Sequence, residues 1–490
     1  MIKKIKSFLF ENKHASQTVA KNTFWLGIGT FSSRVVKAII IIYAARVLGT
    51  TDYGIFSYSL SLAALFSIFA DVGMGPILTR EVAKDPKTLE KNLATSLVIK
   101  LILVGISVIL VAFISPFFST IKGVNNLMIL AALLVAFDAL REFGFSITRA
   151  KEKMETEAAI NLTTSIAVTL FGFGALALKK SALSLMTGYM IGSGIGFILS
   201  FILLRGYLRN LWCLFDASRA LHILKEATPF AVMGLLGAIT TNTDAVMIGW
   251  LNGADDVGRY SVAIRIVGLA YLIPTMIATS VFPLISRLAK KEDARVSQIM
   301  ERIVPFSLSL AIPIFVGGAI LASPILLFLF GSDYVSAGPA FALLLFTIIL
   351  SFPGAIIINS IFAYNEQKTL ITALTLGALG NALLDYLLIP KMGISGSSIA
   401  TVVSQGVAFL IIWGAMKHIN NFKTVKYMWK SLVAGLIMGV VTIVLNALGI
   451  HVILNVIASG MIYILTLTAL KDDVFRQIIT VFKMRKETAL

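Results

Sequence analysis

Long apolar runs alternate with short charged or Pro/Gly-containing turns along almost the whole chain. A helix needs about 20 apolar residues to cross roughly 30 Å of hydrocarbon. Most of the runs are longer than this, and no connecting stretch exceeds about twenty residues, too few for a soluble domain. The pattern predicts an all-α polytopic membrane protein with about fourteen transmembrane helices. We place the spans at residues 22–48, 53–79, 92–118, 124–148, 158–178, 182–204, 228–250, 257–285, 303–330, 337–363, 369–389, 393–416, 429–448 and 452–470.

A degraded internal repeat divides the chain. The sequence Asp52-Tyr-Gly54-Ile-Phe-Ser returns as Asp256-Val-Gly258-Arg-Tyr-Ser, about 204 residues later. Six spans precede the polar stretch 205–228, so the second copy enters the membrane with the same polarity as the first. This predicts two parallel six-helix bundles followed by an extra helix pair. The expected parts are a cytoplasmic lead 1–21, an N-terminal lobe 22–208, a cytoplasmic linker 209–227, a C-terminal lobe 228–418, a helix pair 419–470 and a basic tail 471–490.

The repeated Asp-x-Gly turns open the second and eighth spans. Asp near a helix start can accept hydrogen bonds from free N–H groups, and Gly permits a close approach of two backbones. We interpret Gly54 and Gly258 as structural positions rather than as a binding site. Three other glycines, at four-residue spacing in the sixth span, predict a ridge on which another helix packs closely; they are Gly188, Gly192 and Gly196.

Cationic residues lie inside the first and eighth spans. Thr30, Ser33, Arg34 and Lys37 form one polar stripe on a helix. A charge at mid-bilayer costs at least about 2.5 to 3.5 kcal/mol, so the stripe should face protein or water. Arg265 occupies a polar face of the eighth span. The alternative is that Arg34 and Lys37 only neutralise carboxylates on neighbouring helices.

Carboxylates also lie inside the spans. Asp71 is a candidate partner for a cation of the first span, and Asp244 follows a polar run in the seventh. Asp138 and Glu142 flank Arg141 on the fourth span, which favours a local charge-compensated cluster over a proton relay. Lys100, in the third span, is close enough to its end to extend to the membrane surface.

Composition agrees with a membrane protein. Of 490 residues, 57% are hydrophobic and 14% charged, with a mean hydropathy of +0.89. The net charge of +17 does not indicate nucleic-acid binding, because 31 of the 42 Lys and Arg residues fall in alternate connecting segments. This is the positive-inside pattern, and it places both termini in the cytoplasm. With one cysteine and four histidines outside the apolar core, we expect no disulfide, no metal site and no cofactor.

These features together indicate a secondary transporter. Parallel repeats with inward-facing charge and no extramembrane domain are typical of bundles that rock about a site near the midplane. No GxxxxGK[ST] motif for ATP is present. Seven cations within the spans outnumber five carboxylates, and a surplus of positive charge favours an anionic substrate such as one carrying phosphate.

Several stretches resemble those of Wzx-type polysaccharide flippases of the multidrug/oligosaccharidyl-lipid/polysaccharide exporter superfamily. They are Arg46-Val-Leu-Gly49-x-x-Asp52-Tyr-Gly54, Asp71-x-Gly73, Thr79-Arg80-Glu81, Asp244-Ala-Val-Met-Ile-Gly249, Val257-Gly258-x-Tyr260 and Pro390-x-x-Gly393-x-x-Gly396. The resemblance implies that a polyprenyl-diphosphate-linked oligosaccharide moves from the inner to the outer leaflet by alternating access. It also implies a central cavity lined by spans 1, 2, 7 and 8.

Within that cavity we expect Arg34, Lys37 and Arg265 to contact diphosphate or acidic sugar. Asp71 and Asp244 would hold those cations or couple transport to protons or sodium, and Asp138 and Glu142 would pair locally. Expected partners are the lipid-linked oligosaccharide, the bilayer of the cell membrane and glycan assembly enzymes, with no nucleic acid. No residue is expected to be catalytic.

Three alternatives remain at this stage. A multidrug antiporter of the same superfamily typically has twelve spans and a more acidic cavity, so the extra helix pair and the cationic surplus count against it. A flippase for the peptidoglycan lipid precursor would share the fourteen spans and the basic cavity. A membrane glycosyltransferase or polymerase would need an acid/base constellation in a large external loop, and no such loop is present.

Overall fold

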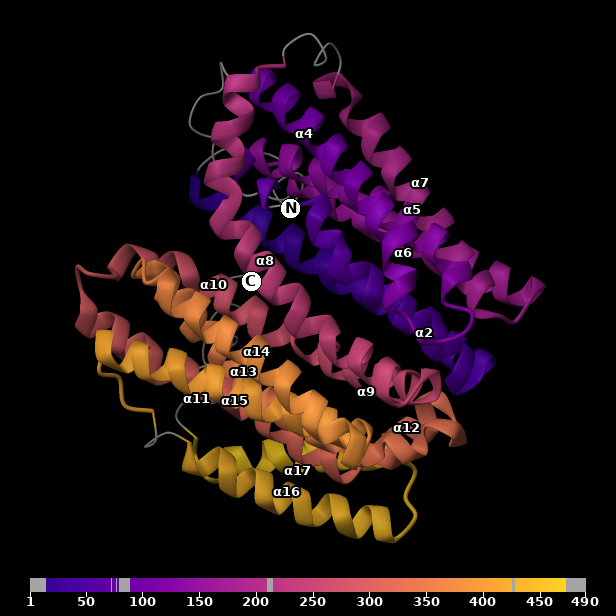
Figure 1. Ribbon diagram of the computed structural model, residues 1–490. Coiled ribbons are helices and arrows are strands. Elements are labelled where there is room, and N and C mark those ends of the chain that lie inside the picture. Colours follow the sequence, from indigo (N-terminus) through magenta and orange to yellow (C-terminus); the bar gives the residue numbers. More distant parts are fainter. Residues whose placement is uncertain are drawn as a thin grey trace, which may run out of the picture. The chain divides into compact units, whose positions relative to one another are not determined.

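The computed structural model describes residues 15–71, 73–75, 77–78, 89–208, 215–424 and 428–472 (Figure 1). The predicted cytoplasmic lead, linker and basic tail each lie partly outside these residues. The elements are α2 (Ala15–Ser67), η1 (Ile68–Ala70), α4 (Leu89–Ile109), η3 (Leu110–Ile114), η4 (Ser115–Phe118), α5 (Asn125–Ala150), α6 (Met154–Leu178), α7 (Ala182–Leu208), α8 (Ala217–Leu251), α9 (Ala254–Ala270), α10 (Leu272–Leu288), α11 (Asp293–Ile320), α12 (Ala322–Phe330), η6 (Ser332–Ala337), α13 (Gly338–Ala363), α14 (Gln367–Met392), α15 (Ile394–Ile419), α16 (Trp429–Ala447) and α17 (Val452–Ala469).

Twelve helical stretches of the described chain are long and apolar enough to cross a membrane. One of them, residues 21–70, contains two helices, because Gly49 has a non-helical backbone (φ 69°, ψ −175°) that divides α2. α5 does not count among the twelve because charged residues, including Asp138, Arg141 and Glu142, fill its second half. Dividing α2 and adding α5 gives fourteen helices, so the predicted all-α membrane fold is confirmed.

A proline interrupts the eighth span, residues 257–285. α9 ends at Ala270 and α10 begins at Leu272, two residues before Pro274. Pro lacks an N–H group, and its ring clashes with the carbonyl four residues earlier, which here is that of Ala270. The break at Tyr271 therefore follows from the sequence.

The chain forms two compact units, residues 1–258 and 259–490. We call these unit 1 and unit 2. The sequence repeat puts its boundary earlier, at 209–227. The structural boundary therefore assigns α8 and the first turn of α9 to unit 1. α8 packs against α2 and α4, and its residues Ile223 and Ala227 form a buried cluster with Met74, Ile77 and Ile99.

In each unit, a side chain that follows the sixth helix is hydrogen-bonded to the start of the third helix, α4 or α11. In unit 1, Arg219 donates to Asn92 at the start of α4 (Nη1–Oδ1 2.9 Å). In unit 2, Asn420 accepts from Ser297 near the start of α11 (Oγ–Oδ1 2.5 Å). Asn92 and Ser297 are about 205 residues apart in sequence, the offset of the repeat.

The glycines of α7 act as the predicted ridge in unit 1. A Cβ atom added to Gly192 would lie 2.4 Å from Val168 Cα, and one added to Gly188 would lie 2.7 Å from Gly172 Cα. One added to Gly196 would lie 2.1 Å from Thr164 Oγ1. Contacts this short allow no side chain, so α6 and α7 touch backbone to backbone.

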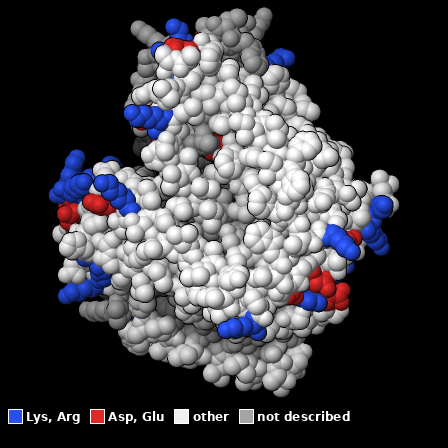
Figure 2. Space-filling view, in the orientation of Figure 1, with Lys and Arg blue, Asp and Glu red and all other residues white. Residues whose placement is uncertain are grey.

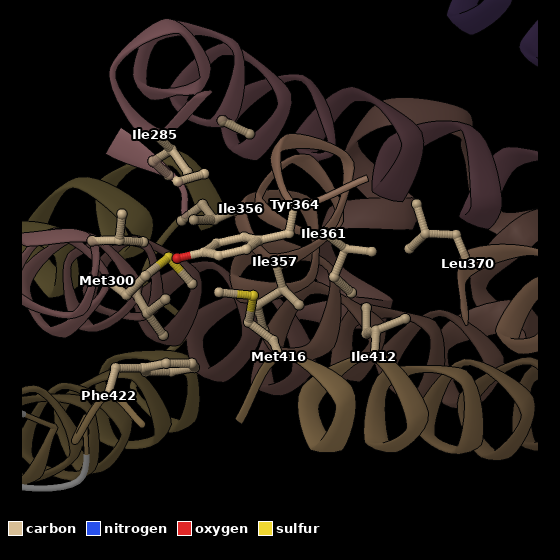
Figure 3. Close-up of a cluster of buried hydrophobic side chains, with 14 of the residues drawn as sticks. Ile285, Met300, Ile356, Ile357, Ile361, Tyr364, Leu370, Ile412, Met416 and Phe422 are labelled. Carbon is tan, nitrogen blue, oxygen red and sulfur yellow. The ribbon is translucent and has the colours of Figure 1, made fainter. Parts of the chain in front are cut away.

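A buried hydrophobic cluster of unit 2 lies at one end of α11, α13 and α15 (Figure 3). The Tyr364 ring lies among Ile357, Ile361 and Met300, and its hydroxyl donates to Asp293 at 2.6 Å. Burial, together with Asp293, raises the pKa of Tyr364 to about 12, so the hydroxyl remains a donor at physiological pH.

The extra pair α16–α17 is joined by its own buried polar contacts. Thr442 donates to Ser459 (Oγ1–Oγ 2.9 Å), which donates to Asn455 (Oγ–Oδ1 2.9 Å). Tyr463 donates to the Ser309 carbonyl of α11 at 2.7 Å, which fixes the pair on unit 2. The face shown in Figure 2 is largely free of charged side chains, and its Lys, Arg, Asp and Glu residues gather toward the margins of the view. This is the surface that a bilayer requires.

Candidate functional site

The stripe on the first half of α2 lies away from its packing face. α2 contacts α6 through Gly29, Val36 and Ile40; Thr169, for example, donates to the Val36 carbonyl at 3.2 Å. At 100° per residue, Arg34 and Lys37 point roughly 80 to 140° away from that face. Arg34 is exposed and Lys37 partly exposed. The fold therefore holds the two cations on a face of α2 that α6 leaves open.

Arg265 lies on α9 in unit 2 and is partly buried. Asp244 lies on α8 in unit 1, where its side chain is 4% exposed. The hydroxyls of Thr240 and Thr241, one turn earlier, donate to the carbonyls of Leu236 and Gly237, both at 2.8 Å. Both hydroxyl groups are therefore hydrogen-bonded to the backbone of α8 itself. That Arg265 and Asp244 take part in transport stays a prediction.

Asp71 is paired, but with a cation that the sequence analysis did not assign to it. Its Oδ1 lies 3.4 Å from Lys100 Nζ, on α4. The expected partner was a cation of the first span. Lys100 is 2% exposed, so its predicted extension to the membrane surface is wrong: its ammonium group is buried against Asp71.

The fourth-span trio separates into two ion pairs. Arg141 Nη1 lies 2.7 Å from Asp138 Oδ1 and donates to Ser193 on α7 at 3.1 Å. Glu142 instead pairs with Arg149, seven residues further along α5 (Oε1–Nη1 3.0 Å). The predicted local pairing holds for Asp138, whereas Glu142 belongs to a different group of charges.

Arg149, which the sequence analysis did not single out, forms ion pairs with two carboxylates. It donates to both carboxylate oxygens of Glu157 on α6, from Nε at 3.0 Å and from Nη2 at 2.6 Å. The signal was present in the sequence, since Arg149 ends one helix and Glu157 opens the next across a short turn. Such a forked pair is among the strongest in proteins.

A second buried polar group joins α14 and α15 in unit 2. Asn381 is 2% exposed and Asp385 0%, and the facing stripe of α15 carries Ser397, Thr401 and Ser404. A Cβ atom on Gly380 would lie 3.7 Å from Ser404 Oγ, which sets the two stripes against each other. The sequence shows the shared face of Asn381 and Asp385, but this pair was not among the predicted site residues.

The profile of the family described as "Polysaccharide biosynthesis protein" matches residues 19–289, more than half of the chain. The chain belongs to this family. A second profile, described as MatE, matches residues 229–387. The two matches agree with the resemblance read from the sequence.

Family relatives are similar along nearly their whole length. "Probable low-salt glycan biosynthesis flippase Agl15" of Haloferax volcanii is 22% identical over 475 residues, covering 93% of this chain and 97% of the relative. "Probable flippase AglR" of the same organism is 26% identical over 455 residues, covering 90% and 94%.

Solved structures share the fold. The chain superposes on "Lipid II flippase MurJ, inward closed conformation" with a TM-score of 0.75 at 20% identity, covering 91% of this chain and 99% of that one. It superposes on the Vibrio cholerae MATE transporter VcmN with a TM-score of 0.59 at 14% identity, covering 82% and 96%.

Proposed function

We propose that this protein is a flippase of glycan biosynthesis. It moves an anionic, polyprenyl-diphosphate-linked oligosaccharide from the inner to the outer leaflet of the cell membrane by alternating access. The observation that carries the proposal is the cationic face of α2, where Arg34 is exposed inside a membrane-length helix of a polysaccharide biosynthesis family member. The relatives named as flippases support the same activity.

Arg34, Lys37 and Arg265 are the proposed contacts for diphosphate or acidic sugar. Guanidinium and ammonium groups make short, charge-assisted hydrogen bonds to phosphate oxygens. Because a charge within the bilayer is costly, cationic side chains there favour a site that an anionic substrate enters.

Three carboxylates of unit 1 are paired with cations outside the stripe on α2. Asp71 pairs with Lys100, Asp138 with Arg141, and Glu142 with Arg149. These three carboxylates are thus matched to cations on α4 and α5 and not to the stripe on α2.

The remaining parts of the proposal concern place and partners. The distribution of Lys and Arg favours cytoplasmic termini in the cell membrane. Glycan assembly enzymes would supply the lipid-linked oligosaccharide on the cytoplasmic side. The protein itself would carry out no catalytic step and hold no cofactor.

One alternative substrate has a specific observation in its favour. The similar structure with a TM-score of 0.75 is titled a lipid II flippase, and 99% of it is covered. A peptidoglycan lipid precursor is also a diphosphate-linked glycolipid, so it would use the same cations. A cation exporter is favoured less, although the MatE profile matches residues 229–387, because a positive stripe repels cationic substrates.

The proposal is tested in liposomes that contain the purified protein. The cargoes, offered separately, are a short diphosphate-linked oligosaccharide on a polyprenyl carrier, a lipid II analogue and a cationic dye. We expect the first to cross, and Arg34→Gln and Arg265→Gln to slow it at unchanged protein abundance. Crossing of the dye alone would contradict the proposal, and a clear preference for the lipid II analogue would reassign the sugar. Full activity in both Gln variants would remove these residues from the substrate site.

A further inference from the structure

α10 carries its hydroxyl groups on the outside of unit 2. The helix has four Ser and Thr residues, and all four are exposed: Thr275, Thr279, Ser280 and Ser286. At 100° per residue, Thr275, Thr279 and Ser286 fall within about 40° of one another. Phe282, which is 37% exposed, lies on the same side. We call Thr275, Thr279, Phe282 and Ser286 the hydroxyl face of α10.

The hydroxyl face is not the side by which α10 packs. Ala278 and Ile285 are buried in the cluster of Figure 3, in which Ile285 is labelled, and Val281 packs against the same cluster. Helical spacing puts these three residues roughly 100° from the hydroxyl face. α10 therefore has one side that packs within unit 2 and another that carries hydroxyl groups and stays open.

The extra pair α16–α17 shows the opposite arrangement. Its polar residues Thr442 and Asn455 are 0% exposed and Ser459 is 3% exposed, whereas exposed residues such as Leu436 and Val440 are apolar. A polar side chain that faces lipid in the hydrocarbon region is unfavourable, so the surface of α16–α17 suits lipid. The hydroxyl face of α10 suits water or a polar ligand instead.

The hydroxyl face presents hydrogen-bond acceptors. The Thr275 hydroxyl donates to the carbonyl of Leu272 and the Thr279 hydroxyl to that of Thr275, both at 2.7 Å. A hydroxyl group has one hydrogen to donate and two lone pairs that accept. Pro283 has no N–H to donate to the carbonyl of Thr279, so that carbonyl loses its usual helical donor. Such a row of oxygen atoms favours a ligand that is rich in hydrogen-bond donors.

Two further features narrow the class of ligand. The ring of Phe282 offers a negative aromatic face, which attracts the polarised C–H groups of a sugar ring. Three exposed cations, Arg287, Lys290 and Lys291, lie at the end of α10 and disfavour a positively charged donor. Sugars fit both features, because their hydroxyl groups donate hydrogen bonds and they are neutral or acidic.

We propose that the hydroxyl face of α10 binds the glycan of the cargo and determines specificity for the sugar. Thr275 and Ser286 are eleven residues apart, about 16 Å along a helix, which is room for more than one sugar ring. The inference rests on the proposed function, which supplies the cargo. It adds a contact for the sugar to the proposed cationic contacts for diphosphate.

The first test measures how cargo protects an engineered cysteine. With Cys213 replaced by serine, Thr279→Cys places a thiol on the hydroxyl face. Leu284→Cys is the matched control, because Leu284 is also exposed but lies about 140° around the same helix. Each variant is treated in liposomes with a water-soluble maleimide. We expect the diphosphate-linked oligosaccharide to slow labelling of Thr279→Cys several-fold, polyprenyl diphosphate without sugar to leave it unchanged, and neither lipid to affect Leu284→Cys.

The second test measures the sugar dependence of transport. Thr279→Val keeps the shape of the side chain and removes the hydroxyl group. Loss of one neutral hydrogen bond weakens binding by about two- to tenfold, so the half-saturating concentration of the oligosaccharide-bearing lipid should rise by that factor. The concentration at which sugarless polyprenyl diphosphate competes should not change. Thr372→Val is the control, because Thr372 is exposed on α14 and its hydroxyl donates within that helix to the Lys368 carbonyl at 3.1 Å.

The proposal is overturned if the sugar-bearing and sugarless lipids protect Thr279→Cys equally, or if a cationic dye protects it and the glycolipid does not. An equal rise of the half-saturating concentration in Thr279→Val and Thr372→Val would also contradict it. Sugar-dependent protection without transport refutes the flippase activity and keeps the glycan face. Transport without protection refutes the glycan face and keeps the activity. Thermal unfolding of Thr279→Val, expected to be near that of the wild type because Thr279 is exposed, checks its fold.

Discussion

At the scale of single residues, loss of the forked ion pair between Arg149 and Glu157 should cost more than loss of an exposed pair. Glu157→Gln removes the charge of the carboxylate that accepts two hydrogen bonds from Arg149 and leaves Glu142 as its ionic partner. A hydrogen bond to a charged group contributes about 1.5 to 3 kcal/mol, so we expect a clear fall in the melting temperature measured in detergent. Glu292→Gln removes an exposed pair of i,i+3 type, worth only about 0.2 to 1 kcal/mol. Equal melting temperatures for the two variants would contradict this ranking.

The sequence identifies which residues carry charge inside the membrane, but not which of them meet. Helical spacing correctly pairs Asp138 with Arg141, because those residues are one turn apart on one helix. It cannot pair Asp71 with Lys100, since their contact depends on where the second helix breaks and how α4 packs beside it. Glu142 lies one turn from Asp138 yet pairs with Arg149, because the two side chains meet at the end of α5.

At the scale of helices, the two repeated turns pack against each other within unit 1. A Cβ atom on Gly54 would lie 1.8 Å from the Ala254 carbonyl oxygen, and one on Gly258 would lie 2.1 Å from that of Thr50. The distances are reciprocal, as expected when two copies of one motif meet. The structural interpretation of Gly54 and Gly258 made from the sequence agrees with this close approach.

Alanine at either position should therefore force the backbones apart. Overpacking of this kind typically costs about 1 to 3 kcal/mol. We expect Gly54→Ala and Gly258→Ala to lower the melting temperature, and Gly105→Ala to leave it unchanged or raise it. Gly105 lies within α4 and has no atoms within 4 Å of an added Cβ. Unchanged melting temperatures in all three variants would mean that the backbones at Gly54 and Gly258 can move apart at little energetic cost.

The positions of the helices can be predicted from the sequence more closely than the packing of one helix on another. Long apolar runs must form helices in a bilayer, since every backbone N–H and carbonyl has to be satisfied within its own segment. The break at Tyr271 likewise follows from Pro274. The grouping of α8 with unit 1 does not, because it depends on side-chain packing such as that of Tyr58, whose ring would lie 2.2 Å from a Cβ on Gly249.

At the scale of the whole molecule, alternating access makes a prediction about the same turns. α9 begins in unit 1 and continues into unit 2 past Gly258. Its first turn is fixed to α2 by Asp255, which accepts hydrogen bonds from Thr50 at 2.7 Å and from Thr51 at 2.6 Å. If the two units move relative to one another during transport, this contact is a place where α9 must either pivot or separate.

A disulfide engineered across the contact between Thr51 and Asp255 tests whether transport requires this contact to open. With Cys213, the single native cysteine, replaced by serine, Thr51→Cys with Asp255→Cys places two thiols where the side chains now touch. We expect oxidation to stop flipping of the diphosphate-linked oligosaccharide and reduction to restore it. Thr442→Cys with Ser459→Cys is the control, because it links α16 to α17 inside the extra pair, where no opening is needed. Full activity of the oxidised Thr51–Asp255 pair would show that this contact persists through the cycle, and that alternating access must open the protein elsewhere.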